Sequence, residues 1–274
     1  MPINSNTTFI PTIWSARINA NLNKNLVLAN LVNMDYSGDV KYGNAVKINR
    51  PARVAAVDYD VTVAITYPQT TAASLTLNID TFKVAPFHVE DLDAVQSNVN
   101  LLETYAQEAA YALADKIDQS ISALYTAQGA GDVAITLAGG DMYAAVVIAG
   151  KNLTLKNVPT VGRWLVVSPA GYASLLTSSK FAQPTALGDA VIRTGVVGQV
   201  AGFDVYVSNN LVNPGTTVFK YLYGSSRAIT HARSLENVES FRQRDFIGTD
   251  VRAMVAFGNK VIEPNALGTI SATE

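Results

Sequence analysis

The sequence of 274 residues contains no cysteine and only two histidines, His88 and His231. The absence of cysteine excludes disulfides, iron–sulfur clusters, thiolate zinc sites and a cysteine nucleophile. The phosphate-binding, dinucleotide-binding, zinc-hydrolase and serine-hydrolase motifs are also missing. Composition alone does not exclude a Ser-His-Asp arrangement, but we interpret both histidines as surface or core residues. We therefore expect no catalytic residue, no cofactor and no metal site.

Charged side chains are scarce as well, because they make up 15% of the chain against about a quarter in an average protein. Neutral Asn, Ser, Thr, Gly and Ala take their place, and a surface so poor in charge suggests that much of it contacts other protein. The net charge is −2 and the pI is about 5.7, which argues against a general nucleic-acid binder. Any contact with DNA is expected to be local.

Long apolar runs are also absent. The longest, from Tyr143 to Ala149, is far too short to span a bilayer. The first residues lack the basic-then-apolar order of a signal peptide. We therefore predict a soluble protein that is made in the cytoplasm and has no membrane partner.

What the sequence does contain is a stretch of forty residues, 88–127, without proline or glycine. Apolar residues recur in it at alternating steps of three and four, which predicts one long helix with an apolar face. Gly129 follows as a stop, and Glu90, Asp91 and Asp93 occupy the expected first turns, where the helix dipole favours negative charge. Such a helix is about 60 Å long, whereas a globule of this chain length is about 48 Å across. The helix should therefore protrude.

The chain before this helix has two patterns. Residues 1–37 are rich in Asn and carry spaced apolar residues, which is typical of an arm with a helical portion. Residues 38–87 alternate apolar and polar side chains, and Pro51 and Pro68 favour an exposed hairpin.

The chain after the helix is mixed and then mostly β. Local signals predict a helix capped by Asp141 and reaching about Lys156, a strand over 163–167, a helix from Pro169 through Leu176, and two short strands folded about Ala201 and Gly202. From Thr217 on, the pattern is mostly strand. The strands before and after the long helix could pair around it, giving one domain from both chain ends and a second from the middle.

Charge is distributed unevenly along the chain. Residues 88–127 hold seven acids and one base, whereas residues 40–57 hold four bases and no acid. Two interpretations remain open. These are ordinary solvated faces, or a basic hairpin of one copy lies across the acidic helix of another, where charge fixes the register. The candidate contact residues are Lys41, Lys47, Arg50 and Arg53 on the hairpin, Glu103, Glu108, Asp115 and Asp118 on the helix, and Arg242 and Arg244 in a second basic set.

Five segments, in this order, resemble the major capsid (coat) protein of tailed double-stranded DNA bacteriophages, which has the Hong Kong 97 type capsid fold. They are FIPTIWSARINANLNKNLVLANLVNMDYSGDVKYGNAVKI, LNIDTFKVAPFHVEDLDAVQS, VPTVGRWLVVSPAGYASLL, GVVGQVAGFDVYVSNNL and VRAMVAFGNKVIEPNAL. The resemblance covers nearly the whole chain and implies an α+β fold. It implies an N-terminal arm over 1–37, an extended loop and peripheral-domain strand over 38–85, a spine helix over 86–129, an axial domain over 130–222 and peripheral-domain strands over 223–274.

The function that the resemblance implies is structural. Copies are expected to form pentamers and hexamers of an icosahedral head around double-stranded DNA, which is bound without sequence specificity. The partners are expected to include a separate scaffolding protein and a portal protein, with assembly in the host bacterial cytoplasm and a final place in the virion capsid. The arm anchors are expected to be Phe9, Ile13 and Trp14, and the loop hinges Gly38 and Gly43.

Two other functions remain open at this point. An encapsulin-type compartment shell has the same fold but encloses cargo enzymes, and its chains usually replace the arm with a cargo-facing helix. A soluble α+β enzyme with an unrecognised site belongs to a different class. Some relatives join their loops by a Lys–Asn bond, but no segment here identifies the partner Asn of Lys41 or Lys47, so that chemistry is not assigned.

Overall fold

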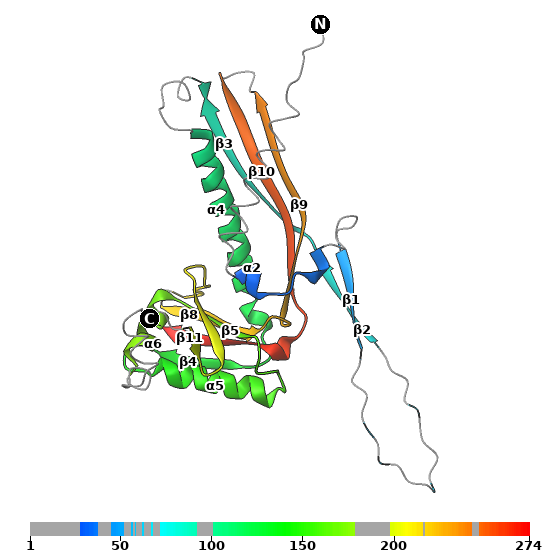
Figure 1. Cartoon of the computed structure of the whole chain (residues 1–274), viewed down its shortest axis with the longest axis vertical. Helices are drawn as coiled ribbons and strands as arrows, with labels where there is room; N and C mark the ends of the chain where they lie inside the picture. The colour runs from blue at the N-terminus through cyan, green and yellow to red at the C-terminus, as the bar shows by residue number, and fades with distance from the viewer. Residues whose placement is uncertain are drawn as a thin grey trace.

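The structure is a computed structural model of an elongated molecule with three parts (Figure 1). A long helix lies beside three strands at one end, a six-stranded sheet with two helices forms the other end, and a two-stranded hairpin projects to the side. The structure describes residues 28–37, 45–51, 72–91, 101–178, 198–215, 217–242 and 247–274, and the single residues 56, 58, 62 and 67.

The first part packs helix α4 (Leu101–Ser122) against a three-stranded antiparallel sheet. The sheet order is β3 (Thr81–Glu90), β10 (Gly248–Val261) and β9 (Ile229–Arg242). Side chains alternate between the two faces of a strand, and one face is buried in the same core as the apolar stripe of α4. That core includes Leu113, Ile117 and Ile121 of the helix and Val238, Val251, Ala253 and Val255 of the sheet.

The predicted start of the long helix is wrong, because residues 88–90 belong to strand β3. Val89 is buried while its neighbours His88 and Glu90 are exposed, so this segment has the two-residue alternation of a strand paired with β10. Residues 92–100 lie outside the described part. Helix α4 itself has 22 residues, or about 33 Å, and it continues as the 3-10 helix η3 (Ala123–Ala127) to the predicted stop.

Part of the predicted arm packs into the body of the molecule. Helix α2 (Leu28–Leu31) buries Leu28 and Ala29 in the core that holds α4. Asn33 then forms a parallel bridge with Thr230 of β9, through Asn33 N–H to the Ile229 carbonyl at 3.0 Å and His231 N–H to the Asn33 carbonyl at 2.9 Å. Residues 28–37 therefore extend the fold of the subunit, and residues 1–27 lie outside the described part.

The second part is the six-stranded sheet, in the order β4-β11-β8-β5-β7-β6. Its strands are β4 (Asp132–Thr136), β5 (Arg163–Val167), β6 (Gln199–Val200), β7 (Phe203–Val207), β8 (Val218–Ser225) and β11 (Leu267–Thr273). Helices α5 (Met142–Leu155) and α6 (Pro169–Thr177) accompany it, and the short 3-10 helix η4 (Pro264–Ala266) precedes β11. All five residues of β5 are buried, which places this strand inside the core.

Local signals predicted this part well. Asp141 caps α5 by accepting the Tyr143 N–H at 3.0 Å, and Pro169 stands in the first turn of α6. Ala201 and Gly202 have positive φ values of 48° and 83° at the turn between β6 and β7. These predictions are confirmed.

The position of the strand after residue 266 differs from the prediction for residues 223–274, which grouped it with the strands around the helix. In the structure β11 pairs in parallel with β4 and antiparallel with β8, inside the six-stranded sheet. The pairing joins segments that are far apart in the sequence, and no local pattern specifies which sheet such a strand enters.

The hairpin consists of β1 (Ala45–Pro51) and β2 (Ala72–Asn78), paired antiparallel. Its root is packed on the body by a small apolar cluster of Ile48, Leu77, Ile79, Ala232 and Ala256. Lys260 Nζ donates to the Thr76 carbonyl at 2.6 Å. The hairpin thus leaves the body from a defined base.

Candidate inter-subunit surfaces

The predicted hairpin bases differ in their surroundings. Arg50 on β1 forms an ion pair with Glu263 and donates to the Ile262 carbonyl at 3.4 Å, so it fastens the hairpin to its own subunit. Lys47, three residues earlier on the same strand, is exposed. Lys41 and Arg53 lie outside the described residues, as do the predicted hinges and arm anchors. Of the four hairpin bases, the structure therefore describes two: Arg50, which is paired within its own subunit, and Lys47, which is exposed to solvent.

The predicted acids of α4 are not equivalent either. Glu108 is exposed and Glu103 is half-buried. Asp115 is half-buried and accepts a hydrogen bond from Gln119 Nε2 at 2.7 Å, while Lys116 Nζ donates to Gln119 Oε1 at 2.9 Å. The exposed acidic face of α4 is thus centred on Glu108.

Asp118 leaves this set, because it is only 1% exposed. It follows Ala114 by four residues and precedes Ile121 by three, so it belongs to the buried stripe of the helix. Its carboxylate does not face solvent and is not presented to another copy. The prediction that Asp118 faces another copy is therefore wrong, and its helical spacing from Ala114 and Ile121 is the sequence signal for its burial.

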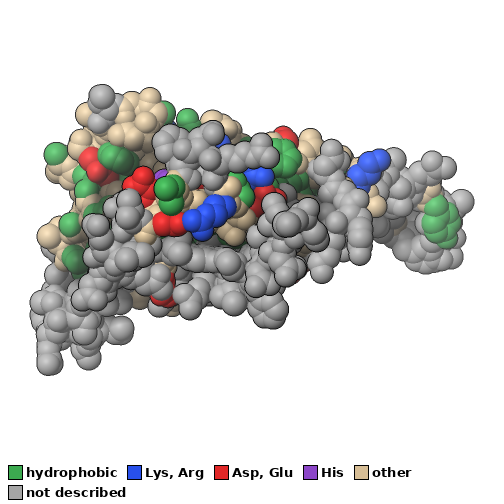
Figure 2. Space-filling view, turned by 90° about the horizontal axis from the view of Figure 1, so that it is seen from above, with side chains coloured by type: hydrophobic (Ala, Val, Ile, Leu, Met, Phe, Trp, Pro, Cys, Tyr) green, Lys and Arg blue, Asp and Glu red, His purple; other side chains and the backbone are tan. Residues whose placement is uncertain are grey.

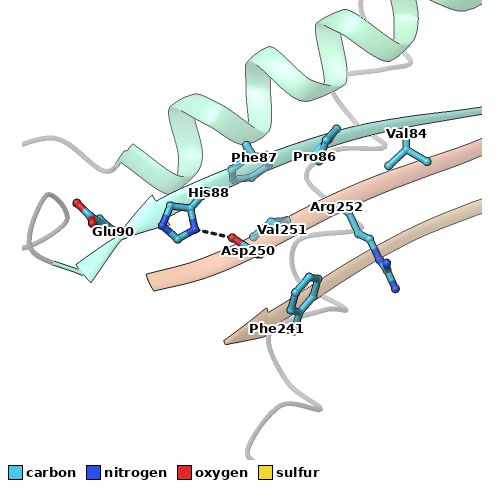
Figure 3. Close-up of a pocket in the computed structure, with 9 residues that line it drawn as sticks. All are labelled: Val84, Pro86, Phe87, His88, Glu90, Phe241, Asp250, Val251 and Arg252. Carbon is cyan, nitrogen blue, oxygen red and sulfur yellow. Dashed lines mark hydrogen bonds and ion pairs between the residues drawn. The ribbon is translucent and has the colours of Figure 1, made fainter. Parts of the chain in front are cut away.

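The outer face of the three-stranded sheet, away from α4, was not predicted as a surface of interest. It carries a groove of about 850 Å³, lined mainly by alternate residues of β3 and β10. His88 Nδ1 and Asp250 Oδ1 face one another across the two strands at 2.5 Å (Figure 3). The Arg252 guanidinium lies 5.5 Å from the ring centre of Phe241 and pairs with Glu239. The period-two alternation of Phe82, Val84, Pro86 and His88 is the sequence signal that could have found it.

Large apolar side chains are exposed on the same face. The exposed fractions are 67% for Phe82, 50% for Val84 and 45% for Phe241. Arg242, which was predicted as a contact residue, pairs with Asp91 near the end of the sheet, and Arg244 lies outside the described residues. Seen along the molecule, acidic and basic side chains lie beside one another near a histidine instead of forming separate patches (Figure 2).

His231 lies in the core beneath the three-stranded sheet. It is fully buried, and its Nδ1 lies 2.6 Å from Asn259 Oδ1, while Asn259 Nδ2 donates to Ser120 Oγ at 3.0 Å. Burial lowers the pKa of His231 to about 4, although the Asn259 hydrogen bond opposes this shift. The imidazole is therefore neutral at pH 7 and links β9, β10 and α4. This is the core role expected for one of the two histidines, while His88 has the surface role.

The described part of the chain contains no group of three or more His, Asp or Glu side chains placed to hold a metal ion. Among the helices described, none combines the length and the apolar character that a membrane span needs.

Comparison with known proteins decides what these surfaces belong to. A family model described as phage capsid protein matches residues 74–270, which is most of the chain. The chain belongs to this phage capsid protein family. A comparison with curated protein sequences gives no match.

Solved structures agree with this assignment of the capsid protein. It is similar to the structure described as Mycobacterium phage Che8, with 28% identity, a TM-score of 0.77, and 89% of this chain and 90% of that chain covered. The capsid structure of Cyanophage P-SCSP1u gives 16% identity, a TM-score of 0.75, and coverages of 91% and 88%. A virus-like particle from Pyrococcus furiosus gives 11% identity, a TM-score of 0.63, and coverages of 96% and 100%. The fold is of the Hong Kong 97 type, as the sequence resemblance implied.

The capsid protein therefore has a structural role in the virion capsid and assembles with copies of itself into capsid oligomers. This assignment does not favour the encapsulin alternative. The exposed apolar side chains of the sheet and the projecting hairpin are accordingly candidate contacts between capsid subunits.

Proposed function

We propose that copies of this protein form pentamers and hexamers that close an icosahedral shell around double-stranded DNA. The observation that carries this proposal is the contrast within one subunit, where a complete core stands beside a sheet face that exposes Phe82, Val84 and Phe241. Several modest contacts per subunit stabilise a closed symmetric shell, because each copy is held by many neighbours at once. Small exposed apolar patches at several places on one subunit can supply such modest contacts.

The parts of the chain have proposed roles in such a shell. Residues 1–27 act as an arm that orders against neighbours through Phe9, Ile13 and Trp14, and residues 38–85 form the extended loop. Helix α4 serves as the spine of a peripheral domain with β3, β9 and β10, and the six-stranded sheet is the axial domain. Gly38 and Gly43 let the loop angle differ between pentamers and hexamers, because glycine tolerates a wider range of backbone angles.

The proposed loop contact places the hairpin of one copy across α4 of another. Lys47, with Lys41 and Arg53, supplies the positive charge, and Glu103, Glu108 and Asp115 supply the negative charge. Arg50 is engaged by Glu263 of its own subunit, so we assign it to holding the hairpin. Arg242 and Arg244 form a second proposed contact. Charge complementarity of this kind sets register and partner choice more than affinity.

The further partners belong to the same proposal. A separate scaffolding protein and a portal protein direct assembly in the cytoplasm of a bacterial host. The packaged DNA is held without sequence specificity, and the low charge of the chain suits a lining that does not bind the genome tightly.

Sedimentation velocity combined with negative-stain electron microscopy of the expressed protein tests the proposal. We expect closed particles of uniform size with five-fold and six-fold clusters. A compact monomer at every concentration tried would contradict the proposed shell. In particles from infected cells we expect nuclease-protected DNA, and a protein cargo in its place would revive the encapsulin alternative.

The loop contact has its own test in a charge reversal, Lys47→Glu. We expect the subunit to keep its melting temperature, because exposed ion pairs contribute little to stability, and to lose most of its particle yield. Lys151→Glu on the exposed side of α5 is the matched control and should assemble normally. Equal yields from the two variants would remove Lys47 from the contact.

A further inference from the structure

A polar groove of about 440 Å³ lies at the root of the hairpin. Residues from separate stretches of the chain line it, among them Asn33, Arg50 of β1, Lys156 and Asn157 at the end of α5, Arg227 of the turn after β8, and Glu263 after β10. The groove is thus formed where the hairpin, the segment before it and both sheets come together. None of the contacts between copies that are proposed above uses this groove.

The charges in this groove do not balance. Arg50 and Glu263 neutralise one another in an ion pair. Lys156 and Arg227 are exposed, and neither has a carboxylate partner among the residues that the structure describes. Among the residues described, the groove therefore holds two positive charges without a carboxylate partner. Asn33 also lines the groove, and because its Oδ1 accepts the Asp35 N–H at 2.8 Å, its side-chain N–H groups are the remaining donors.

We propose that this groove binds an acidic side chain of a second copy of the protein, with Lys156 and Arg227 contacting the carboxylate. The capsid protein assembles with its own copies, and its surface supplies matching groups. Glu90 is an exposed acid for which the described part of the chain offers no basic partner, and the loop contact proposed above does not use it. Charge complementarity between an unpaired basic groove and unpaired acids gives specificity to contacts between copies.

A nucleic-acid phosphate fits the groove less well. Proteins that bind the nucleic-acid backbone present a stripe or patch of several bases, whereas this concave site has two free bases and an acid in its wall. A single carboxylate needs only two or three donors. The inference goes beyond the proposed function, because it names a specific contact between two copies. It does not depend on whether the copies form pentamers and hexamers.

Carbodiimide coupling of assembled particles tests the inference directly, because the reagent condenses a lysine amine with a carboxylate that touches it. Particles are assembled from an equal mixture of ¹⁴N and ¹⁵N protein, so that mass spectrometry separates links between copies from links within one. We expect an amide between Lys156 and an Asp or Glu of another copy, with no such link from Lys151. Links from Lys156 only to its own chain, for example to Glu263, would overturn the proposal.

A pair of variants gives an independent readout. Lys156→Gln with Arg227→Gln removes both charges while keeping polar side chains, and Lys151→Gln is the control. The variant loses the charge-assisted hydrogen bonds to the carboxylate, so we expect the protein concentration needed for assembly to rise at least about tenfold with an unchanged melting temperature of the subunit. Unchanged assembly would refute the proposal. Normal particles that fail to retain DNA would also refute it, in favour of phosphate binding.

Discussion

The two sheets of this capsid protein differ in how much of their surface is buried within one subunit. The six-stranded sheet encloses β5 completely, and several buried polar groups in it form hydrogen bonds, among them Ser168 Oγ at 2.8 Å from the Tyr221 hydroxyl. Arg163 donates to the carbonyls of Pro159 and Val158 at 2.9 and 2.7 Å. In the described part of the chain, one face of the three-stranded sheet packs against α4, and its outer face exposes large apolar groups. Within one subunit the six-stranded sheet is thus covered more fully than the three-stranded one, and we propose that assembly covers the exposed face of the latter.

The largest effect on subunit stability is expected from truncating a core side chain of the six-stranded sheet. Phe203→Ala removes a fully buried ring that packs edge-on against Tyr223 at 6.2 Å between ring centres. We expect the free energy of unfolding to fall by about 3 to 5 kcal/mol, measured by urea denaturation of the unassembled subunit.

The matched variant on the other sheet is Phe82→Ala. Because its ring is mostly exposed in the subunit, the loss should be within about 0.5 kcal/mol, while particle yield should drop. A large loss of subunit stability from Phe82→Ala would contradict the division between a complete and an incomplete sheet.

The second-largest effect is the loss of subunit stability at acidic pH. The pKa of His231 is about 4 in the folded protein against 6.5 ordinarily, because burial disfavours the charged form. As the pH falls below 6.5 the unfolded chain takes up a proton that the folded chain does not, so folding weakens until the pH reaches about 4. The contribution lost is about 3 kcal/mol. Unfolding free energies measured between pH 7 and 4 should fall more steeply for the natural chain than for His231→Gln, and parallel curves would show that His231 does not titrate as stated.

The third effect tests the joint between the hairpin and the three-stranded sheet. A Cβ added at Gly258 of β10 would lie 2.0 Å from the Asn78 carbonyl oxygen, which is backbone and cannot move aside cheaply. We expect Gly258→Ala to destabilise the subunit by about 1 to 3 kcal/mol and to loosen the hairpin root, seen as faster amide exchange in β2. Gly215→Ala, where a Cβ meets nothing within 4 Å, is the control, and equal stability of the two variants would contradict the close packing.

The smallest effect belongs to the charged rim of the three-stranded sheet. Asp91→Asn breaks the exposed pair with Arg242, and we expect less than about 1 kcal/mol of destabilisation, decreasing further with added salt. Thermal unfolding at low and high ionic strength measures it. A loss that salt does not change would mean that the pair acts through packing and not through charge.

Sequence predicted those elements whose signals are local. Asp141 as a cap, Pro169 in a first turn, and Ala201 with Gly202 as a tight turn each act within a few residues, so they needed no knowledge of the rest of the chain. The family resemblance supplied the overall fold. These are the features that the structure and the comparisons confirm.

The errors came from interactions between distant residues. Residues 88–90 form a strand because β10 pairs with them. Strand β11 belongs to the six-stranded sheet because it pairs with β4 on one side and β8 on the other. Arg50 was assigned to another copy, yet its partner Glu263 is more than two hundred residues away on the same chain. Asp118 was misplaced for a different reason, since its helical spacing already indicated burial.

The position of β11 has a consequence for how the subunit is made. This strand lies between β4 and β8, so β4 has no partner in the described sheet until almost all of the remaining chain has been synthesised. Pairing of segments so far apart in sequence is slow, and we infer that the six-stranded sheet closes only after translation has passed β11. A nascent or truncated chain without β11 then lacks a finished sheet, and a subunit competent to join a growing shell is one in which β11 has been made.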